Sequence, residues 1–515
     1  MTFWTPDNLR SCTGGSWLIR PPQIELPKDR PADMPPPPLH APISGLSTDS
    51  RSIRPGQVFL ALRGENHDGH GYLADAARAG APVLIVDDPA SVPAGGFNPP
   101  CGVLKVEETG KALLRIAAAY RSSLKRTKVI AVCGSNGKTT TTRLLDHLLG
   151  QTMRGTASVK SFNNAVGVPL TILSAKESDQ YLICEVGTNA PGEIVQLAEV
   201  VRPDIAVITS IGREHLEGLG DLAGVAKEEA GVLDFIRPGG CAVVNADAPE
   251  LAEHLRRVKT AITFGRSPEA QLRLTGASHV VDALGTPSLV FMVNDRLECR
   301  LPLVGEHNAV NALAALAVAR RLGIDESKAG AALATAGGAE MRLQRIRIGG
   351  VTVFNDSYNA NPDSMIAGID TLLALREAGA GDRTGRVVCV LGEMRELGAA
   401  SDSAHRAVAQ TLIDRSRSGK RIDLVILVGA GMVHARDALA DTGWSPERTA
   451  YFPDADGARA SQIAALLEPG DIVLVKGSRR VRLERVVQAL GDAGTPQPIA
   501  RAGASGIDRP LKAAI

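Results

Sequence analysis

The chain has little of several features that would place it in a class at once. Only 3% of its 515 residues are aromatic, and 57 basic residues are balanced by 56 acidic ones, for a net charge of +1. A protein this close to neutral has no global field to attract nucleic acid or an anionic membrane. No apolar run approaches the ~18 residues of a membrane span, and residues 1–20 lack a secretory signal pattern. We therefore expect a cytoplasmic protein with no membrane span and no nucleic-acid partner.

Cysteine is scarce as well, and its placement excludes two common uses. The seven cysteines are odd in number and never spaced as Cys-x-x-Cys. Zinc sites and disulfide frameworks need paired or closely spaced cysteines, so neither is predicted. Free thiols fit a reducing compartment. The scattered positions are Cys12, Cys101, Cys133, Cys184, Cys241, Cys299 and Cys389.

Glycine, by contrast, is abundant at 53 residues, and strand-like runs alternate with helical ones. The length predicts about three domains, at roughly 100–200 residues each. We expect a small α/β domain over 1–125 with a proline-rich insertion at 21–42, and a central domain over 126–338. The C-terminal domain covers 339–515, with a flexible tail after about residue 492. Such alternation predicts mostly parallel sheets covered by helices on both faces.

Buried-strand patterns give the coarse architecture. Three C-terminal runs end at glycine, which is how a doubly wound sheet places ligand-binding turns at its carboxyl edge. The expected fold class is α/β, with a P-loop ATPase-like central sheet and a Rossmann-like third domain. Helices are expected at 72–79, from the central glycine-rich turn to 149, and at 308–322. The expected strands are 57–62, 82–86, 128–133, 181–184, 205–209, 241–245, 261–264, 387–391, 424–428 and 472–475.

The most specific local signal is a glycine-rich turn between a strand and a helix. Its residues are Gly134, Ser135, Asn136, Gly137, Lys138, Thr139 and Thr140. Glycines allow successive backbone amides to surround an anion at a helix N-terminus. Lys138 would reach the β- and γ-phosphates, and the Thr139 hydroxyl would hold Mg²⁺. The general GxxxxGK[ST] pattern has glycine where this chain has Val132, so a chance tight turn is the alternative to a nucleoside triphosphate site.

Two further side chains follow strands of the same predicted sheet. Glu185 comes directly after the run 181–184, and His215 follows the run 205–209. A doubly wound sheet collects ligands at this edge. Carboxylate oxygens suit Mg²⁺ well, and imidazole suits it less. The alternative is a capping glutamate and a hydrogen-bonded loop histidine.

Taken together, these residues resemble the Mur ligase family, ATP-dependent enzymes that join amino acids or peptides to a UDP-linked muramic acid. The family's phosphate loop is similar to residues 134–140, which accounts for Val132. The motifs at 391–398 and 476–479 favour the branch that adds D-alanyl-D-alanine to UDP-N-acetylmuramoyl-tripeptide. The other matching segments are 47–51, 55–56, 59–64, 68–70, 163–169, 185–189, 191–194, 215–218, 305–308, 311–312 and 356–362.

The resemblance implies an amide-bond ligase that works through an acyl phosphate, with ATP and two Mg²⁺ ions. It implies that Lys138, Glu185 and His215 are catalytic and that Thr139, Glu185 and His215 are metal ligands. To both sets we add Glu229, as a hypothesis of our own that is explained below. Residues 134–140 would bind the ATP phosphates, and Asn308 and Asn311 would face the adenine. Arg342 and Asp356 would reach the nucleotide from the C-terminal side. The UDP-sugar would contact Ser50, Arg51, Asp68, His70, Asn163 and Asn164. Asn308 and Asp356 have simple capping roles as alternatives.

One position departs from the family pattern. Most members carry a carbamylated lysine fourteen residues after the histidine, and here that position is Glu229. Our hypothesis is that the Glu229 carboxylate replaces the carbamate at a magnesium ion. The alternatives are that Lys227 is carbamylated instead, or that 226–229 is a solvated helix face.

Two other functions compete with the cell-wall ligase. A folate- or cyanophycin-type ligase is disfavoured by segments 48–51 and 68–70, and a regulatory module without chemistry by the full set of catalytic residue types. The basic residues between Lys476 and Arg485 indicate a solvated helix start or contacts to an anionic substrate rather than nucleic acid. We expect a monomer. The third residue of the acceptor peptide, lysine or diaminopimelate, stays open.

Overall fold

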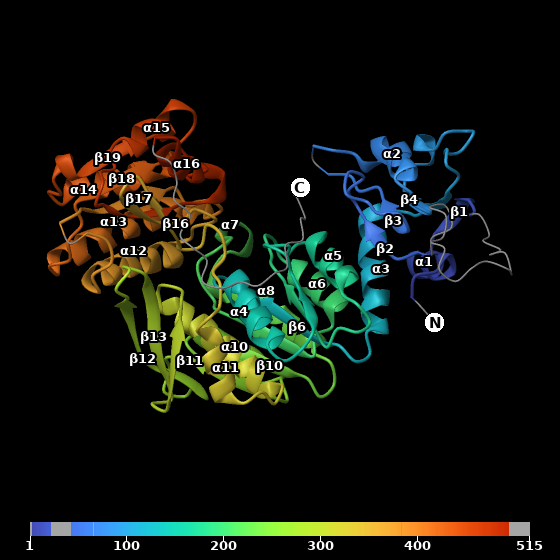
Figure 1. The fold of residues 1–515 in the computed structure, drawn as a ribbon, viewed down its shortest axis with the longest axis horizontal. Helices are drawn as coiled ribbons and strands as arrows, with labels where there is room; N and C mark the ends of the chain where they lie inside the picture. Colours follow the sequence, from blue (N-terminus) through green and yellow to red (C-terminus); the bar gives the residue numbers. More distant parts are fainter. Residues whose placement is uncertain (1–2, 22–42, 65, 383, 494–515) are drawn as a thin grey trace.

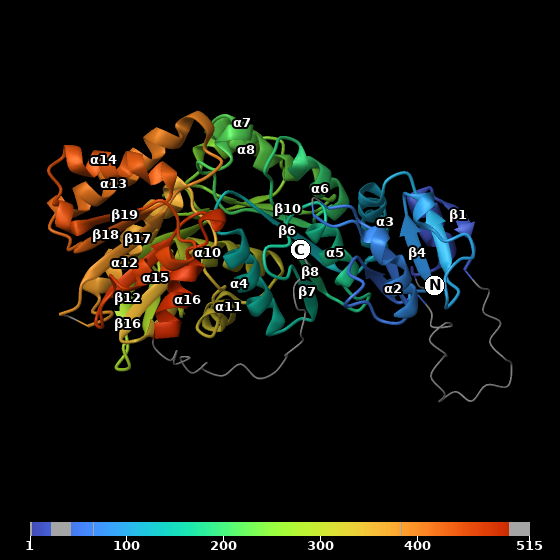
Figure 2. The same cartoon turned by 90° about the horizontal axis from the view of Figure 1, so that it is seen from above.

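Three sheets arranged in a row organise the chain. The computed structural model describes residues 3–21, 43–64, 66–382 and 384–493. Nearly all of the proline-rich insertion and the tail after about residue 492 lie outside them. The first and C-terminal domains stand at opposite ends of the central one (Figures 1 and 2). Within the described residues, no helix is both long enough and apolar enough to cross a membrane.

The first domain is a five-stranded sheet with order β1-β5-β4-β3-β2, in which only β1 runs antiparallel. The predicted strands at 57–62 and 82–86 and the helix at 72–79 are present with slightly shorter bounds. The elements are α1 (Pro6–Thr13), β1 (Ser16–Ile19), β2 (Gly45–Ser47), β3 (Gln57–Leu60), α2 (Leu73–Arg78), β4 (Val83–Val86), β5 (Gly102–Lys105) and α3 (Thr109–Ser123).

The central domain holds a nine-stranded sheet with order β14-β13-β12-β11-β10-β9-β6-β8-β7. Its strands from β7 to β12 are parallel, as predicted, but β12, β13 and β14 form an antiparallel extension that the sequence did not predict. Its strands are β6 (Lys128–Cys133), β7 (Gly155–Ala157), β8 (Tyr181–Glu185), β9 (Ile205–Ile208), β10 (Cys241–Asn245), β11 (Ala261–Gly265), β12 (Leu272–Val281), β13 (Pro287–Val293) and β14 (Leu297–Leu301). Its helices are α4 (Lys138–Gly150), α5 (Gly167–Ser174), α6 (Glu193–Val201), α7 (Leu216–Leu219), α8 (Leu222–Ala230), α9 (Ala252–Leu255), α10 (Glu306–Arg321) and α11 (Glu326–Leu333).

The C-terminal domain is a doubly wound sheet with order β15-β16-β20-β17-β18-β19, parallel except at β15. Apolar clusters cover both of its faces. Its strands are β15 (Gln344–Ile348), β16 (Val351–Asp356), β17 (Val387–Gly392), β18 (Leu424–Val428), β19 (Thr449–Phe452) and β20 (Ile472–Lys476). Its helices are α12 (Pro362–Glu377), α13 (Ser401–Arg417), α14 (Val433–Asp441), α15 (Ala458–Ala464) and α16 (Glu484–Ala493).

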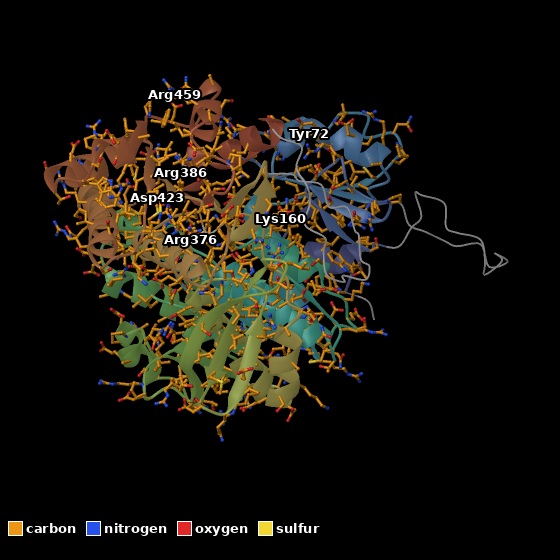
Figure 3. All side chains as sticks on the ribbon, turned by 60° about the vertical axis from the view of Figure 1, so that its left-hand side comes forward. Tyr72, Lys160, Arg376, Arg386, Asp423 and Arg459 are labelled. Atoms are coloured by element: carbon orange, nitrogen blue, oxygen red, sulfur yellow. The ribbon has the colours of Figure 1, made fainter. Side chains whose placement is uncertain are left out.

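Charged pairs tie together the amino ends of the C-terminal strands. Arg386 Nη2 lies 2.8 Å from Asp471 Oδ2, and Asp423 Oδ2 accepts a hydrogen bond from the Val387 amide at 2.7 Å. Figure 3 labels Arg386 and Asp423 on this domain. Because these polar groups satisfy one another, the opposite, carboxyl edge of the sheet is the one left to bind ligands.

The first and central domains share a continuous apolar core. One cluster joins Leu60 and Leu113 of the first domain to Val129 and Ile208 of the central sheet. Arg121, at the end of α3, is buried and donates to the carbonyls of Val201 and Arg202, each at 2.8 Å. The first domain is therefore anchored to the central one through α3.

Candidate functional site

A cavity of about 950 Å³ lies between the central and C-terminal domains. Its walls come from the carboxyl ends of β6, β8 and β9 on one side and of β16, β17 and β20 on the other. Such edges are where ligands bind in open α/β sheets. The predicted site residues that line it are Ser135, Asn136, Gly137, Lys138, Thr140, Asn163, Asn164, Glu185, His215, Asn308, Asn311, Arg342 and Asp356.

The phosphate loop is fixed by contacts within the protein. Gly134 has φ +115°, and a Cβ there would collide with Thr209 Oγ1; Gly137 has φ +88°, and a Cβ would collide with Asn311 Oδ1. Asn136 N donates to Ser210 Oγ at 2.9 Å, which fixes the loop between the two glycines. Since α4 starts at Lys138, the loop amides and the helix N-terminus face the same cavity, as an anion site requires.

Lys138 carries its charge into this loop. Its Nζ donates to the carbonyls of Gly134 and Ser135 and lies 3.8 Å from Glu214 Oε1. Burial by itself would lower the pKa of Lys138, but the surrounding carboxylates of Glu214, Glu229 and Glu185 outweigh it and raise that pKa. The ammonium is thus held charged where phosphate oxygens would meet it.

Three buried carboxyl groups surround the loop. Glu185, Glu214 and Glu229 each keep one buried oxygen that has no hydrogen-bond partner among the described residues. Burial raises the pKa of all three, that of Glu214 to about 8. Buried carboxyl oxygens without partners are costly, so this cluster is arranged for something other than stability.

Sequence reasoning missed Glu214. It stands beside His215 in the motif that predicted the histidine, but adjacency alone does not say which side chain turns inward. The fold buries Glu214 next to Lys138. The only signal for Glu214 in the sequence was that a charged residue directly precedes the predicted histidine.

Glu229 lies behind the phosphate loop rather than on the cavity wall. It is fully buried, and its Oε2 accepts a hydrogen bond from Gly134 N at 2.8 Å. The interpretation of 226–229 as a solvated helix face is therefore wrong for this residue. Lys227, one of the rival candidates, is exposed on the same helix.

The donor set fits magnesium. Free oxygens of Glu185 and Glu229 and the Thr139 hydroxyl at the start of α4 are the oxygen donors that Mg²⁺ prefers. No three His, Cys, Asp or Glu side chains of the described residues converge well enough to hold a cation by themselves. A magnesium ion here would share its coordination with phosphate oxygens and water, which is its usual habit at nucleotide sites.

The C-terminal domain reaches into the phosphate site. Arg342 Nη2 donates to Thr139 Oγ1 at 2.9 Å and to Ser161 Oγ at 3.3 Å, with its guanidinium 4.3 Å from the Tyr358 ring centre. Asp356 accepts from Lys476 Nζ at 2.7 Å. Lys476 is 2% exposed and ends β20, so the expectation of a solvated helix start is wrong for it.

His215 connects the two domains. Its Nδ1 lies 2.6 Å from Glu396 Oε2, and its backbone has φ +49°. Burial lowers the pKa of His215, and the Glu396 carboxylate opposes that shift. Close by, Arg213 Nη2 lies 2.7 Å from Asp363 Oδ1, a second ion pair across the same boundary.

The two predicted adenine residues brace the loop. Asn308 Nδ2 donates to Val304 O at 2.7 Å, and Asn311 Nδ2 donates to Asn308 Oδ1 at 3.0 Å. Both are buried at the start of α10, with Asn311 against Gly137. Asn308 and Asn311 thus support the phosphate loop through Gly137, and their contact with adenine stays a prediction.

The predicted residues of the first domain lie apart from this cavity. Arg51 is 71% exposed and pairs with Asp49 at 2.9 Å. Asp68 Oδ1 lies 2.6 Å from His70 Nδ1, and His70 Nε2 accepts from Asp87 N at 3.3 Å. His70 thereby holds a turn. Ser50 stands beside Arg51 in the turn that follows β2.

Asn163 and Asn164 line the cavity itself. Asn163 Nδ2 donates to Glu185 Oε1 at 3.0 Å, and Asn164 Oδ1 accepts from Gly167 N at 2.9 Å. Figure 3 labels Lys160, from the same central-domain segment, and Tyr72 of the first domain. Asn163 and Asn164 therefore belong to the nucleotide side of the site.

Comparison with known proteins agrees with this geometry. Family models match residues 42–121 (Mur ligase family, catalytic domain), 132–319 (Mur ligase middle domain) and 341–479 (Mur ligase, glutamate ligase domain). UDP-N-acetylmuramoyl-tripeptide--D-alanyl-D-alanine ligase of Bacillus subtilis (strain 168) is 32% identical over 455 residues, 87% of this chain and 93% of the relative.

Solved structures show the same arrangement. A crystal structure of MurF from Acinetobacter baumannii has a TM-score of 0.78 at 29% identity and covers 95% of this chain and 98% of its own. MurF ligase from Thermotoga maritima in complex with ADP has a TM-score of 0.72 at 25% identity, covering 87% and 97%. This chain belongs to the Mur ligase family.

Proposed function

We propose that this chain is an ATP-dependent amide-bond ligase of peptidoglycan precursor synthesis. It joins D-alanyl-D-alanine to UDP-N-acetylmuramoyl-tripeptide and releases ADP and phosphate. Relatives that carry the name of this ligase align over most of the chain, and one similar structure holds ADP. The observation that carries the proposal is the preformed phosphate loop, with a charged Lys138, in a cavity shared with the C-terminal sheet.

The chemistry explains why so many charges are needed. A carboxylate oxygen is a poor leaving group, so the γ-phosphoryl group of ATP is first transferred to the terminal carboxylate of the acceptor. The amine of the dipeptide then attacks the acyl phosphate, a tetrahedral intermediate forms, and phosphate departs as the amide is made. Negative charge accumulates throughout, and fixed cations stabilise it.

Each protein group has a proposed part in these steps. Lys138 donates to the β- and γ-phosphates, and the loop amides orient them. Arg342 adds a guanidinium from the C-terminal domain next to Thr139. Asn308, Asn311 and Asp356 hold the nucleoside end of ATP. Together they align the transferred phosphoryl group with the acceptor.

Thr139, Glu185, His215 and Glu229 are the residues that would hold magnesium. When bound, Mg²⁺ supplies positive charge to the phosphate oxygens. Glu229 brings a carboxylate to the position where most of the family has a carbamylated lysine. Its fully buried, partner-free oxygen supports this role.

On the acceptor side we propose that Ser50, Arg51, Asp68 and His70 hold the UDP-sugar, with Asn163 and Asn164. Ser50, Arg51, Asp68 and His70 lie apart from the phosphate cavity, whereas Asn163 and Asn164 line it. This separation suits a long acceptor whose nucleotide end and peptide end lie far apart. Closure of domains around the substrates would complete the site and shield the acyl phosphate from water.

The working unit we propose is a single chain of three parts, 1–125, 126–338 and 339–515. Each would bring one substrate: the muramoyl peptide, ATP and the dipeptide. Because all three parts come from one chain, a monomer suffices. The seven cysteines are all free, which supports a cytoplasmic location.

Phosphate release from ATP tests the function. The purified protein, given Mg²⁺ and UDP-N-acetylmuramoyl-tripeptide, should release phosphate and form the pentapeptide only when D-alanyl-D-alanine is added. Folate or cyanophycin substrates are the controls, and neither should support release. Parallel assays with lysine- and diaminopimelate-containing acceptors identify the third residue. Release that is indifferent to the dipeptide contradicts the proposal.

A further inference from the structure

A buried histidine of the C-terminal domain lies outside the residues discussed so far. His405 sits in the first turns of α13 and is fully buried. Its Nδ1 lies 2.7 Å from the Ser401 carbonyl, and its Nε2 lies 3.0 Å from the Met394 amide. Both ring nitrogens are therefore used.

These partners define one form of the ring. The Ser401 carbonyl can only accept a hydrogen bond, so Nδ1 carries the proton. The Met394 N–H can only donate, so Nε2 is unprotonated. Burial favours this neutral form by lowering the pKa of His405. Gly431 packs against the ring so closely that a Cβ there would lie 2.8 Å from the imidazole Cε1.

Met394 belongs to a loop, residues 393–398, that we call the crossing loop. It leaves the end of β17, and its apolar members Met394 and Leu397 are buried in the domain core. The Glu393 side chain accepts from Gly431 N at 2.9 Å. The crossing loop is therefore held at two points. Met394 N donates to the His405 ring, and the Glu393 side chain accepts from Gly431, which itself packs against that ring.

The polar members of the crossing loop face the reaction site. Arg395 and Glu396 line the cavity. Glu396 Oε2 lies 2.6 Å from His215 Nδ1, and its carbonyl accepts from Glu217 N at 3.3 Å. Glu396 reaches there with φ +64°, a strained value for a side-chain-bearing residue. Such a conformation persists only where its surroundings impose it.

We infer that His405 is a positioning residue of the ligase reaction: by accepting from Met394 N, it fixes the crossing loop that brings Arg395 and Glu396 to the cavity and to His215. The inference rests on the proposed function. Without the ring acceptor, Met394 N–H would be a buried donor without a partner, and the loop would be free to shift. Displacement of such a support by about 1 Å can reduce a rate by about 100-fold.

Two substitutions separate the two hydrogen bonds. In His405→Gln, the amide oxygen at the ε position can still accept from Met394 N. In His405→Asn, the shorter side chain can still donate to the Ser401 carbonyl but cannot reach Met394. His434→Asn is the matched control, because His434 lies on α14 outside the cavity and pairs with Asp402.

Steady-state kinetics with each substrate varied, and thermal melting, are measured for all forms. His405→Asn should lower kcat by about 10- to 100-fold, with the KM for ATP nearly unchanged, because the phosphate loop lies in the other domain. His405→Gln should restore most of kcat, and the His434 variant should match the wild type. Equal kcat for the Asn and Gln variants, or a loss that follows melting temperature alone, overturns the inference.

A second variant tests the inference if His405→Asn does not fold. Gly431→Ala pushes on the Cε1–Nε2 edge of the ring, which carries the acceptor for Met394 N, and should lower kcat in the same way. An unchanged kcat also overturns the inference. The wild type separates the two proposals. If it forms no amide, the proposed function is wrong. If it does and the histidine variants fail to differ, only the positioning role is wrong.

Discussion

The phosphate end and the acceptor end of the proposed site are built differently. Around Lys138, three carboxyl groups are buried, each with an oxygen that lacks a partner among the described residues. Around Arg51, the charged groups are mostly exposed, and Asp49 and Asp68 are satisfied within their own turns. Among the residues that the structure describes, the phosphate end keeps buried polar atoms without a hydrogen-bond partner, and the acceptor end has none.

This difference indicates where binding energy is concentrated. Electrostatic interactions strengthen as water is excluded, so a change of one group at the buried end has large consequences. Exposed charges are screened and contribute little each. Substitutions at the two ends should therefore differ in size, and four experiments, ordered by expected effect, test that expectation.

The largest loss is expected for Lys138→Met. It removes the cation that meets the phosphates and leaves Glu214 without its neighbour at 3.8 Å. Turnover should fall by about 10²- to 10³-fold, as when one preorganised donor is removed from an active site. The exposed Lys128 gives the matched control, Lys128→Met. Turnover close to wild type for Lys138→Met would show that the buried end is not where the phosphates bind.

Glu229 comes next. Glu229→Ala should lower turnover by about 10- to 100-fold, a usual cost for losing a group that supports a metal site. Glu229→Gln keeps an acceptor for Gly134 N, so it should recover loop structure but require more Mg²⁺. A Gln variant with normal Mg²⁺ dependence would reduce Glu229 to a loop support. Lys227→Ala is the control, and a loss there would instead favour a carbamylated Lys227.

The third experiment uses acid stability. Burial lowers the pKa of His307, a cavity residue, to about 4 from 6.5. Between pH 6.5 and 4 the unfolded chain takes up a proton that the folded chain does not, so stability falls as the pH falls. The slope is at most about 1.4 kcal/mol per pH unit. The free energy of unfolding in urea, plotted against pH, should have a shallower slope for His307→Gln than for the wild type. His67→Gln, at the exposed end, is the control and should keep the wild-type slope. Identical slopes for wild type and His307→Gln would refute this.

The smallest effect belongs to Arg51→Ala at the exposed end. Solvent screens an exposed ion pair or contact, so its loss has a small effect, and the KM for the UDP-linked acceptor should rise by no more than about fivefold. The melting temperature should stay the same. Arg54→Ala serves as control. A loss as large as that of Lys138→Met would remove the contrast between the two ends.

Much of the fold followed from the sequence. The strands at 128–133, 241–245 and 424–428 have the predicted bounds because short, nearly continuous apolar runs define buried parallel strands. The hairpins β12 to β14 were missed because half-exposed strands have a weaker signal. β12 alternates buried with half-buried positions only as far as Thr275, and beyond that none of its residues is buried.

The site was less accessible to sequence reasoning. The phosphate loop is local, so its residues could be named from spacing alone. Glu214 and the Lys476–Asp356 pair depend on which side chains the fold turns inward, and nothing local records that. The parts assigned to Arg342 and Asp356 came from family resemblance, and the structure places both at the cavity.

The shared core of the first two domains has a consequence for how the protein comes apart. Leu60 and Leu113 pack into the same apolar cluster as Val129 and Ile208. Cutting the chain after residue 125 would therefore expose an apolar surface on each fragment. The first and central domains should consequently unfold together in one cooperative transition, and the buried hydrogen bond from Arg121 to the Val201 carbonyl strengthens their connection.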